Sequence, residues 1–226
     1  MTEMLLRTLI KEIADSSPTV TPGSVIYCDM DGVLVDFESG TVELLNSVLD
    51  GGGADWVRKE GRTWRQAIRR LHREMGPDWR ASTRADLDIK PVRNFMFAVI
   101  KDNPGAFFGA LPTLSDGVDQ LWPYINSTGH TVKLLTAGVS GRAEGMTSEQ
   151  GKTTWAMENL SPPPGELIMM PASQKAEYAT EGETANILID DKPSTISSWV
   201  DRGGIGILHS PGGSASTIKQ LREMGV

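Results

Sequence analysis

Val25-Ile26-Tyr27-Cys28-Asp29-Met30-Asp31-Gly32-Val33-Leu34-Val35-Asp36-Phe37 is the stretch that decides the fold. It predicts a buried strand that runs directly into two carboxylates one residue apart, followed by a glycine and a second apolar run. The simplest alternative is a β-turn, because Asp and Gly are favoured turn residues. The apolar runs on both sides, together with motifs further along the chain, favour a functional site at the end of a strand.

Length and composition indicate one good-sized domain, or one domain that carries an insertion. The chain has 226 residues, of which 39% are hydrophobic, which suffices for a packed core and argues against disorder. The formal net charge of −7 argues against nucleic acid as a general partner. The single cysteine, Cys28, excludes an intramolecular disulfide and a Cys-rich metal site.

No stretch of the sequence predicts a membrane span, which needs about 20 apolar residues. Residues 1–17 predict a helical extension without the uninterrupted apolar core of a signal peptide. We therefore expect a cytoplasmic protein with no membrane partner. The sequence leaves its oligomeric state open.

From Phe107 onward, strands and helices alternate, which is typical of an α/β protein with a doubly wound parallel sheet. We expect strands at 24–29, 131–136, 166–170, 185–190 and 204–209, and helices at 115–126, 147–160, 173–180, 195–202 and 214–224. Chemistry in such sheets gathers beyond the carboxyl ends of the strands. The residues that follow the expected strands are Asp29-Met30-Asp31, Thr136-Ala137, Lys175 and Asp190-Asp191.

The connection between the first two expected strands is too long for a simple crossover. It spans about 100 residues, whereas a crossover takes little more than a dozen. We therefore expect a helical cap at residues 38–106, inserted after the first strand, with helical patterns at 40–50 and 56–75. The core domain would comprise residues 18–37 and 107–226, preceded by the extension 1–17. Such a cap limits bulky substrates and excludes water from the reacting group.

The ordered motifs resemble the four motifs of haloacid dehalogenase (HAD) superfamily phosphohydrolases, over about residues 24–209. The resemblance implies a HAD-like, Rossmann-like sheet with a cap. Within the superfamily the chain is most similar to the 5'(3')-deoxyribonucleotidases. The stretches that carry this narrower resemblance are Asp29–Phe37, Phe107-Phe108 before Leu111-Pro112, Lys152-Thr-Thr-Trp155, and Ile187-Leu-Ile-Asp-Asp-Lys-Pro193.

The carboxylates support phosphoryl transfer on chemical grounds. A carboxylate such as Asp29 can attack a phosphoryl group and form an aspartyl-phosphate, while Asp31 serves as general acid and base. A hard cation must neutralise the anions, and Mg²⁺ prefers oxygen ligands. We expect Asp29, Asp190 and Asp191 to bind it, and the resemblance implies that the backbone carbonyl of Asp31 does so too. A dehalogenase would not need the second aspartate, so Asp31 favours phosphate chemistry.

The phosphate should be held by Thr136, Ala137 and a lysine. Two lysines compete for that role. Lys152 lies inside the helix expected at 147–160, where lysines are usually solvated, whereas Lys175 follows a strand. We therefore assign Lys175 as the cation that holds Asp29 and the phosphate. Related nucleotidases commonly have a hydroxyl residue in place of Ala137.

Aromatic and basic residues near the cap are candidates for substrate binding. A base could stack on Phe37, Trp64, Phe107 or Phe108, although each tryptophan of the cap is more often a core residue. Arg142 could contact the phosphate. We expect an Mg²⁺-dependent phosphomonoesterase for nucleoside monophosphates, deoxyribonucleotides first. The alternatives are a phosphatase for sugar phosphates or nucleic-acid 3' ends, and a noncatalytic nucleotide- or Mg²⁺-binding module.

Overall fold

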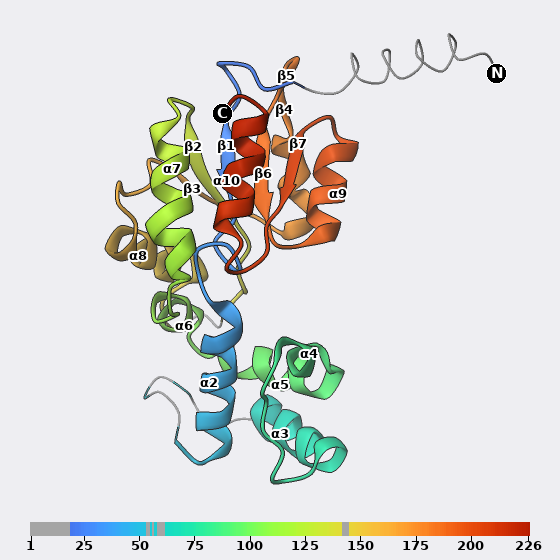
Figure 1. The fold of residues 1–226 in the computed structure, drawn as a ribbon. Coiled ribbons are helices and arrows are strands. Elements are labelled where there is room, and N and C mark those ends of the chain that lie inside the picture. Colours follow the sequence, from blue (N-terminus) through green and yellow to red (C-terminus); the bar gives the residue numbers. More distant parts are fainter. Residues whose placement is uncertain (1–18, 53–54, 56, 58–61, 142–144) are drawn as a thin grey trace, which may run out of the picture.

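The computed structural model describes residues 19–226, apart from 53–54, 56, 58–61 and 142–144. A five-stranded, all-parallel sheet with the order β3-β2-β1-β6-β7 forms its centre (Figure 1). This confirms the predicted doubly wound α/β fold. The strands are β1 (Ile26–Cys28), β2 (Val132–Thr136), β3 (Leu167–Met169), β6 (Ile187–Asp190) and β7 (Ile205–Leu208).

Strand β1 lies in the middle of the sheet. Ile26 pairs with Val132 of β2 on one side and with Ile187 of β6 on the other. Its apolar residues alternate between the two faces, so that Ile26 joins the main hydrophobic core and Tyr27 joins a second, smaller cluster with Trp199. A strand that is buried on both faces needs a nearly continuous apolar sequence, which Val25–Cys28 supplies.

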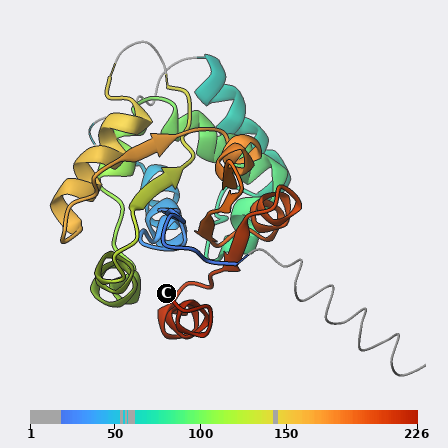
Figure 2. The same ribbon diagram turned by 90° about the horizontal axis from the view of Figure 1, so that it is seen from above.

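Helices cover both faces of the sheet. α7 (Trp122–Ser127) and α10 (Ser214–Glu223) lie on the same face (Figure 2), and Trp122 and Leu221 are completely buried there. On the other face, Trp199 of α9 (Pro193–Asp201) packs edge-on against Tyr27, with ring centroids 5.5 Å apart. Both faces of the sheet are therefore covered by helices, as a doubly wound sheet requires.

The helices from α2 to α6, which follow β1 in the chain, lie beyond the carboxyl ends of the strands (Figure 1). α6 (Pro104–Gly109) returns the chain to the sheet and packs closely on α8 (Ser148–Asn159). A Cβ on Gly151 would lie 2.1 Å from the Gly105 carbonyl oxygen, so the close approach needs glycine. This placement agrees with a helical insertion after the first strand, and the exact domain limits stay a prediction. The inserted helices are α2 (Phe37–Leu49), α3 (Arg62–Met75), α4 (Arg84–Asp88) and α5 (Lys90–Ile100).

Asn103 starts α6 by accepting a hydrogen bond from the Ala106 N–H. Two segments further along the chain differ from the sequence-based expectation. The helix expected at 115–126 consists of a π-helical turn, 117–121, followed by α7. Pro123 lacks an N–H, which favours the wider turn before it.

The segment around 172–185 also differs. A 3₁₀ helix, Ala172–Tyr178, replaces the short α-helix, and it leads into a hairpin of β4 (Thr180–Glu181) and β5 (Thr184–Ala185) that was not expected. The helix expected at 56–75 begins at Arg62 within the described residues, and the predicted extension at 1–17 lies outside them. No helix in the part of the chain that the structure describes is long and apolar enough to cross a membrane.

Candidate active site

The turn after β1 places two aspartates at the edge of the sheet. The Met30 carbonyl accepts hydrogen bonds from the N–H groups of Val33, Leu34 and Val35, which closes a compact turn. Gly32 has a φ of +79° there, a conformation that glycine adopts without strain. A Cβ on Gly32 would also lie 2.5 Å from Asp191 Oδ2. Gly32 therefore lets the carboxylate after β6 approach the turn after β1.

Three carboxylates meet at this edge. Asp29 from β1 and Asp190 and Asp191 from the end of β6 each offer an oxygen atom, and these atoms lie within 4.8 Å of one another. Asp29 and Asp190 are buried, so their charges would repel strongly without a cation. A cluster of oxygen ligands that offers only carboxylates fits a hard divalent cation such as Mg²⁺. The residues present therefore fit the metal expected from the sequence.

Lys175 lies between two of these carboxylates. Its Nζ is 2.9 Å from Asp29 Oδ2 and 2.7 Å from Asp190 Oδ2, and the residue is 1% exposed. Burial by itself lowers the pKa of Lys175, but the two carboxylates outweigh it and raise the pKa above its usual value. Burial, followed by the charge of Asp29, raises the pKa of Asp190 to about 6. The structure thus places Lys175 where the sequence analysis expected a cation that holds Asp29.

The expectation that Lys152 is solvated is wrong. Lys152 is 1% exposed, and its Nζ donates to Asp31 Oδ2 at 2.7 Å and to Thr136 Oγ1 at 2.8 Å. The physical reason is the close packing of α8 on α6, which buries one face of α8 and brings the Lys152 ammonium 4.6 Å from the centre of the Phe108 ring. The buried face follows the helical spacing Ser148, Gly151, Lys152, Trp155, a signal that could have identified Lys152 from the sequence.

Asp31 has two differently placed oxygen atoms. Oδ2 accepts the hydrogen bond from Lys152, whereas Oδ1 is buried and has no hydrogen-bond partner among the described residues. Burial raises the pKa of Asp31, and Asp29 raises it further, while the charge of Lys152 opposes both effects. Asp31 therefore combines an orphaned oxygen atom with an increased tendency to carry a proton, as a general acid requires.

A cavity of about 400 Å³ opens over the carboxylates. Thr136 is fully buried and is not one of its lining residues; its hydroxyl oxygen faces Lys152 instead. The cavity is also lined by three cap residues that were not candidates from the sequence, Glu38, Ser39 and Arg84. The lining residues that were candidates are Asp29, Asp31, Phe37, Ala137, Lys175, Asp190 and Asp191.

Most of the candidate aromatic residues lie in the protein interior. Phe107 and Phe108 are each 3% exposed, and Phe37 packs edge-on against Phe107 with centroids 5.8 Å apart. Trp64 packs against Phe95 of α5, with centroids 6.2 Å apart. Of the four aromatic candidates, the structure brings only Phe37 to the cavity. Arg142 lies outside the described residues, and its role stays a prediction.

Comparison with known proteins gives a likeness of fold. No family model and no curated protein matches the sequence. Solved structures similar to the chain include a HAD-superfamily hydrolase from Ehrlichia chaffeensis, at 12% identity and a TM-score of 0.46, covering 93% of this chain and 100% of that one. A HAD-hydrolase from Bacillus subtilis bound to magnesium is 12% identical, with a TM-score of 0.47 and coverage of 82% and 86%.

An L-2-haloacid dehalogenase is similar to the same extent. It is 15% identical, with a TM-score of 0.46, and the match covers 85% of this chain and 86% of that one. HAD hydrolases and a dehalogenase thus have comparable likeness to this chain, and a shared fold does not carry an activity with it. These likenesses assign no reaction to this chain, so its own residues must indicate one.

Proposed function

We propose that the protein is an Mg²⁺-dependent phosphomonoesterase that acts through an aspartyl-phosphate on Asp29. The observation that carries the proposal is Asp31, whose Oδ1 is buried and without a partner among the described residues while Lys152 holds Oδ2. The leaving alkoxide of a phosphoester needs a proton, and a leaving halide does not. A second aspartate that can carry a proton therefore favours phosphoester hydrolysis over dehalogenation.

In the first step, the Asp29 carboxylate attacks phosphorus and the ester P–O bond breaks. Asp31 gives its proton to the leaving oxygen, so that the products of this step are an alcohol and an aspartyl-phosphate. The Asp29 side chain is fixed for the attack, because Oδ1 accepts a hydrogen bond from the Met30 N–H at 2.7 Å and Oδ2 contacts Lys175. Such fixed positioning lowers the entropy cost of the displacement.

In the second step, Asp31, now ionised, takes a proton from a water molecule that attacks phosphorus. The bond between phosphorus and Asp29 breaks, which restores the carboxylate and releases phosphate. Lys152 supports this step because its positive charge favours the ionised form of Asp31. Asp31 thereby alternates between acid and base while Asp29 alternates between free and phosphorylated.

Asp29, Asp190 and Asp191 would hold the metal ion. When bound, Mg²⁺ offsets the negative charge of the carboxylates and of the phosphoryl oxygens. Lys175 contributes a second positive charge, in contact with both Asp29 and Asp190. The phosphate would then lie between Lys175 and the metal site, over the turn that follows β1.

For the substrate we propose nucleoside monophosphates, deoxyribonucleotides first. The sequence stretches that resemble those of 5'(3')-deoxyribonucleotidases support this choice, as does Phe37, an aromatic residue that lines the cavity. A cavity of about 400 Å³ is of the size usual for small-molecule sites. Sugar phosphates are the alternative within the same reaction.

The deciding experiment measures phosphate release across nucleoside monophosphates, sugar phosphates and an L-2-haloacid, with Mg²⁺ and with EDTA. We expect Mg²⁺-dependent phosphate release, highest with a deoxyribonucleoside monophosphate, and none from Asp29→Asn. Halide release without phosphatase activity would overturn the reaction. A preference for sugar phosphates would overturn the substrate class alone, and Mg²⁺ binding without turnover would favour the noncatalytic module.

A further inference from the structure

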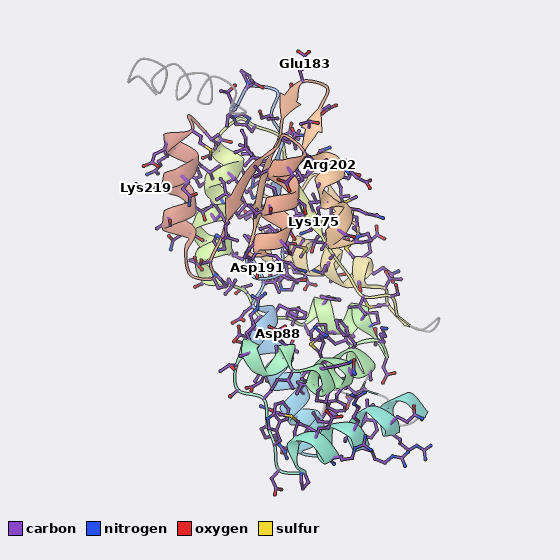
Figure 3. The ribbon with its side chains drawn as sticks, turned by 90° about the vertical axis from the view of Figure 1, so that its right-hand side faces the viewer. Asp88, Lys175, Glu183, Asp191, Arg202 and Lys219 are labelled. Carbon is purple, nitrogen blue, oxygen red and sulfur yellow. The ribbon has the colours of Figure 1, made fainter. Side chains whose placement is uncertain are left out.

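Arg84 extends from the cap to the carboxylates of the metal site. It is the first residue of α4, and its Nη1 lies 2.8 Å from Asp191 Oδ2. Arg84 lines the same cavity as Asp29 and Lys175. Figure 3 shows Asp191 at the edge of the α/β core, facing the cap helix that carries Asp88 at its other end. The contact therefore joins two parts of the chain across the site.

The backbone of Arg84 is fixed, whereas its side chain has room to move. The Arg84 N–H donates to Glu38 Oε1 at 2.8 Å, and Thr83 and Asp86 form a capping box at the start of α4. The Arg84 side chain is nevertheless 58% exposed, against 10% for that of Asp191. A half-exposed guanidinium on a fixed helix start can change partners without a movement of the helix.

Arg84 and a metal ion would share one carboxylate. Asp191 supplies an oxygen atom to the carboxylate cluster and accepts the hydrogen bond from Arg84 with Oδ2. Two cations on one carboxylate repel each other, so a divalent ion at the cluster weakens the contact with Arg84. Arg84→Gln removes that competition and leaves the carboxylate to the metal alone.

A guanidinium that leaves Asp191 would lie at the mouth of a cavity built for a phosphoryl group. Arginine suits a phosphate because its planar N–H groups match two phosphate oxygens at once. Arg84 lies on the cap side of the cavity, whereas Lys175 lies on the core side. The two cations would therefore contact a bound phosphate from opposite sides.

We propose that Arg84 is a substrate-binding residue that Asp191 holds until the metal ion binds and that then contacts the phosphate. This inference rests on the proposed function, since it takes the metal and the phosphoester from it. Arg84 would thereby couple the two binding events. The metal weakens the contact between cap and core, and the phosphate replaces Asp191 as the partner of Arg84.

The test measures two affinities by titration calorimetry at low ionic strength, that of Mg²⁺ alone and that of inorganic phosphate with saturating Mg²⁺. For Arg84→Gln we expect Mg²⁺ to bind about twofold to fivefold more tightly, since a half-exposed ion pair no longer competes. We expect phosphate to bind about tenfold more weakly, since a charge-assisted contact is lost. Damage to the fold or to the cap would weaken both affinities. An increase in Mg²⁺ affinity together with a decrease in phosphate affinity is therefore specific to the proposed role of Arg84.

Arg80→Gln is the matched control. Arg80 is also an arginine of the inserted segment in an ion pair, with Nη2 2.6 Å from Asp50 Oδ1, but it does not line the cavity. Both affinities should equal those of the wild type. The inference is overturned if Arg84→Gln leaves Mg²⁺ binding unchanged or weaker, or leaves phosphate binding unchanged. The proposed metal site stands in that case if Asp190→Asn abolishes Mg²⁺ binding. A wild-type protein that binds no Mg²⁺ overturns the inference and the proposed function together.

Discussion

Lys152 and Asp31 are 121 positions apart in the sequence, yet Lys152 Nζ lies 2.7 Å from Asp31 Oδ2. The contact occupies Oδ2 and leaves Oδ1 as the oxygen atom of Asp31 that would exchange a proton in the proposed reaction. It also opposes the burial and the charge of Asp29, both of which raise the pKa of Asp31. Lys152 is therefore a positioning residue in the proposed reaction, because it acts through Asp31.

Replacement of Lys152 should change the pH dependence of turnover. In Lys152→Met the pKa of Asp31 rises further, so Asp31 stays protonated to higher pH and cannot take a proton from water. We expect the acidic limb of the kcat profile to move to higher pH, and kcat near pH 6 to fall by about tenfold to a hundredfold. Steady-state kinetics between about pH 5 and pH 9 measures both effects.

Lys133→Met provides the control for this measurement. Lys133 also forms an ion pair, 2.8 Å from Glu166, but it lies near the amino end of β2, away from the site, and both side chains are partly exposed. Its pH profile should match that of the wild type. An acidic limb that stays in place in Lys152→Met would show that Lys152 does not act on Asp31.

The sheet and the edge that carries the carboxylates could be predicted because local sequence determines them. Apolar runs such as Val25–Cys28 are buried wherever they form strands, and parallel strands bring their carboxyl ends to one edge. That rule alone predicts the positions of Asp29, Asp190 and Lys175. It does not predict the position of the Lys152 side chain, because the burial of Lys152 depends on the contact between Gly105 and Gly151, in two helices far apart in the chain.

The cap is the part that the sequence predicted least well. Its helices are visible as periodic patterns, but the pairing of Arg84 with Asp191 joins residues 107 positions apart and depends on where α4 lies in space. The sequence offers no sign that this arginine contacts a carboxylate of the core. Trp64 was likewise a candidate for stacking on a base, and its packing against Phe95 depends on how the cap helices meet in space.

The two aspartates of the first motif should respond differently to the same substitution. Asp29→Asn should abolish turnover, because an amide does not form the phosphorylated intermediate. Asp31→Asn should lower kcat by about a hundredfold to ten-thousandfold and leave Asp29 able to react. Substrates with good leaving groups, such as aryl phosphates, should lose less activity in Asp31→Asn because they need little protonation. An equal loss for alkyl and aryl phosphates would contradict the acid role of Asp31.

The stability of the metal-free protein should depend on Asp190 in a pH-dependent way. Its pKa of about 6 lies above the ordinary value of 3.8, so the folded state binds the proton more tightly than the unfolded state does. The stabilisation from this proton is complete below about pH 4 and is lost as the pH rises to about 6. Asp190→Asn avoids that loss. Its free energy of unfolding relative to the wild type should therefore increase by about 1–3 kcal/mol between pH 4 and pH 7.

Urea unfolding in EDTA at several pH values measures this difference. Added Mg²⁺ should stabilise the wild type and have little effect on Asp190→Asn, since the variant lacks one carboxylate of the metal site. A constant difference between the two proteins across the pH range would contradict the raised pKa. Asp119→Asn, on the exposed surface of the π-helical turn, serves as the control.

Replacement of Gly32 should weaken Mg²⁺ binding, in addition to the loss of stability that its backbone conformation causes. In Gly32→Ala the new Cβ would lie 2.5 Å from Asp191 Oδ2, so the Asp191 carboxylate must shift from its position. Gly129→Ala is a matched control, because its φ of +83° is equally unfavourable for alanine and nothing lies within 4 Å of the new Cβ. Both variants should lose roughly 1–2 kcal/mol of stability from the left-handed backbone. We expect only Gly32→Ala to bind Mg²⁺ about tenfold or more weakly by calorimetry, since the carboxylates lose their alignment. Equal Mg²⁺ affinities in the two variants would mean that the contact between Gly32 and Asp191 does not shape the metal site.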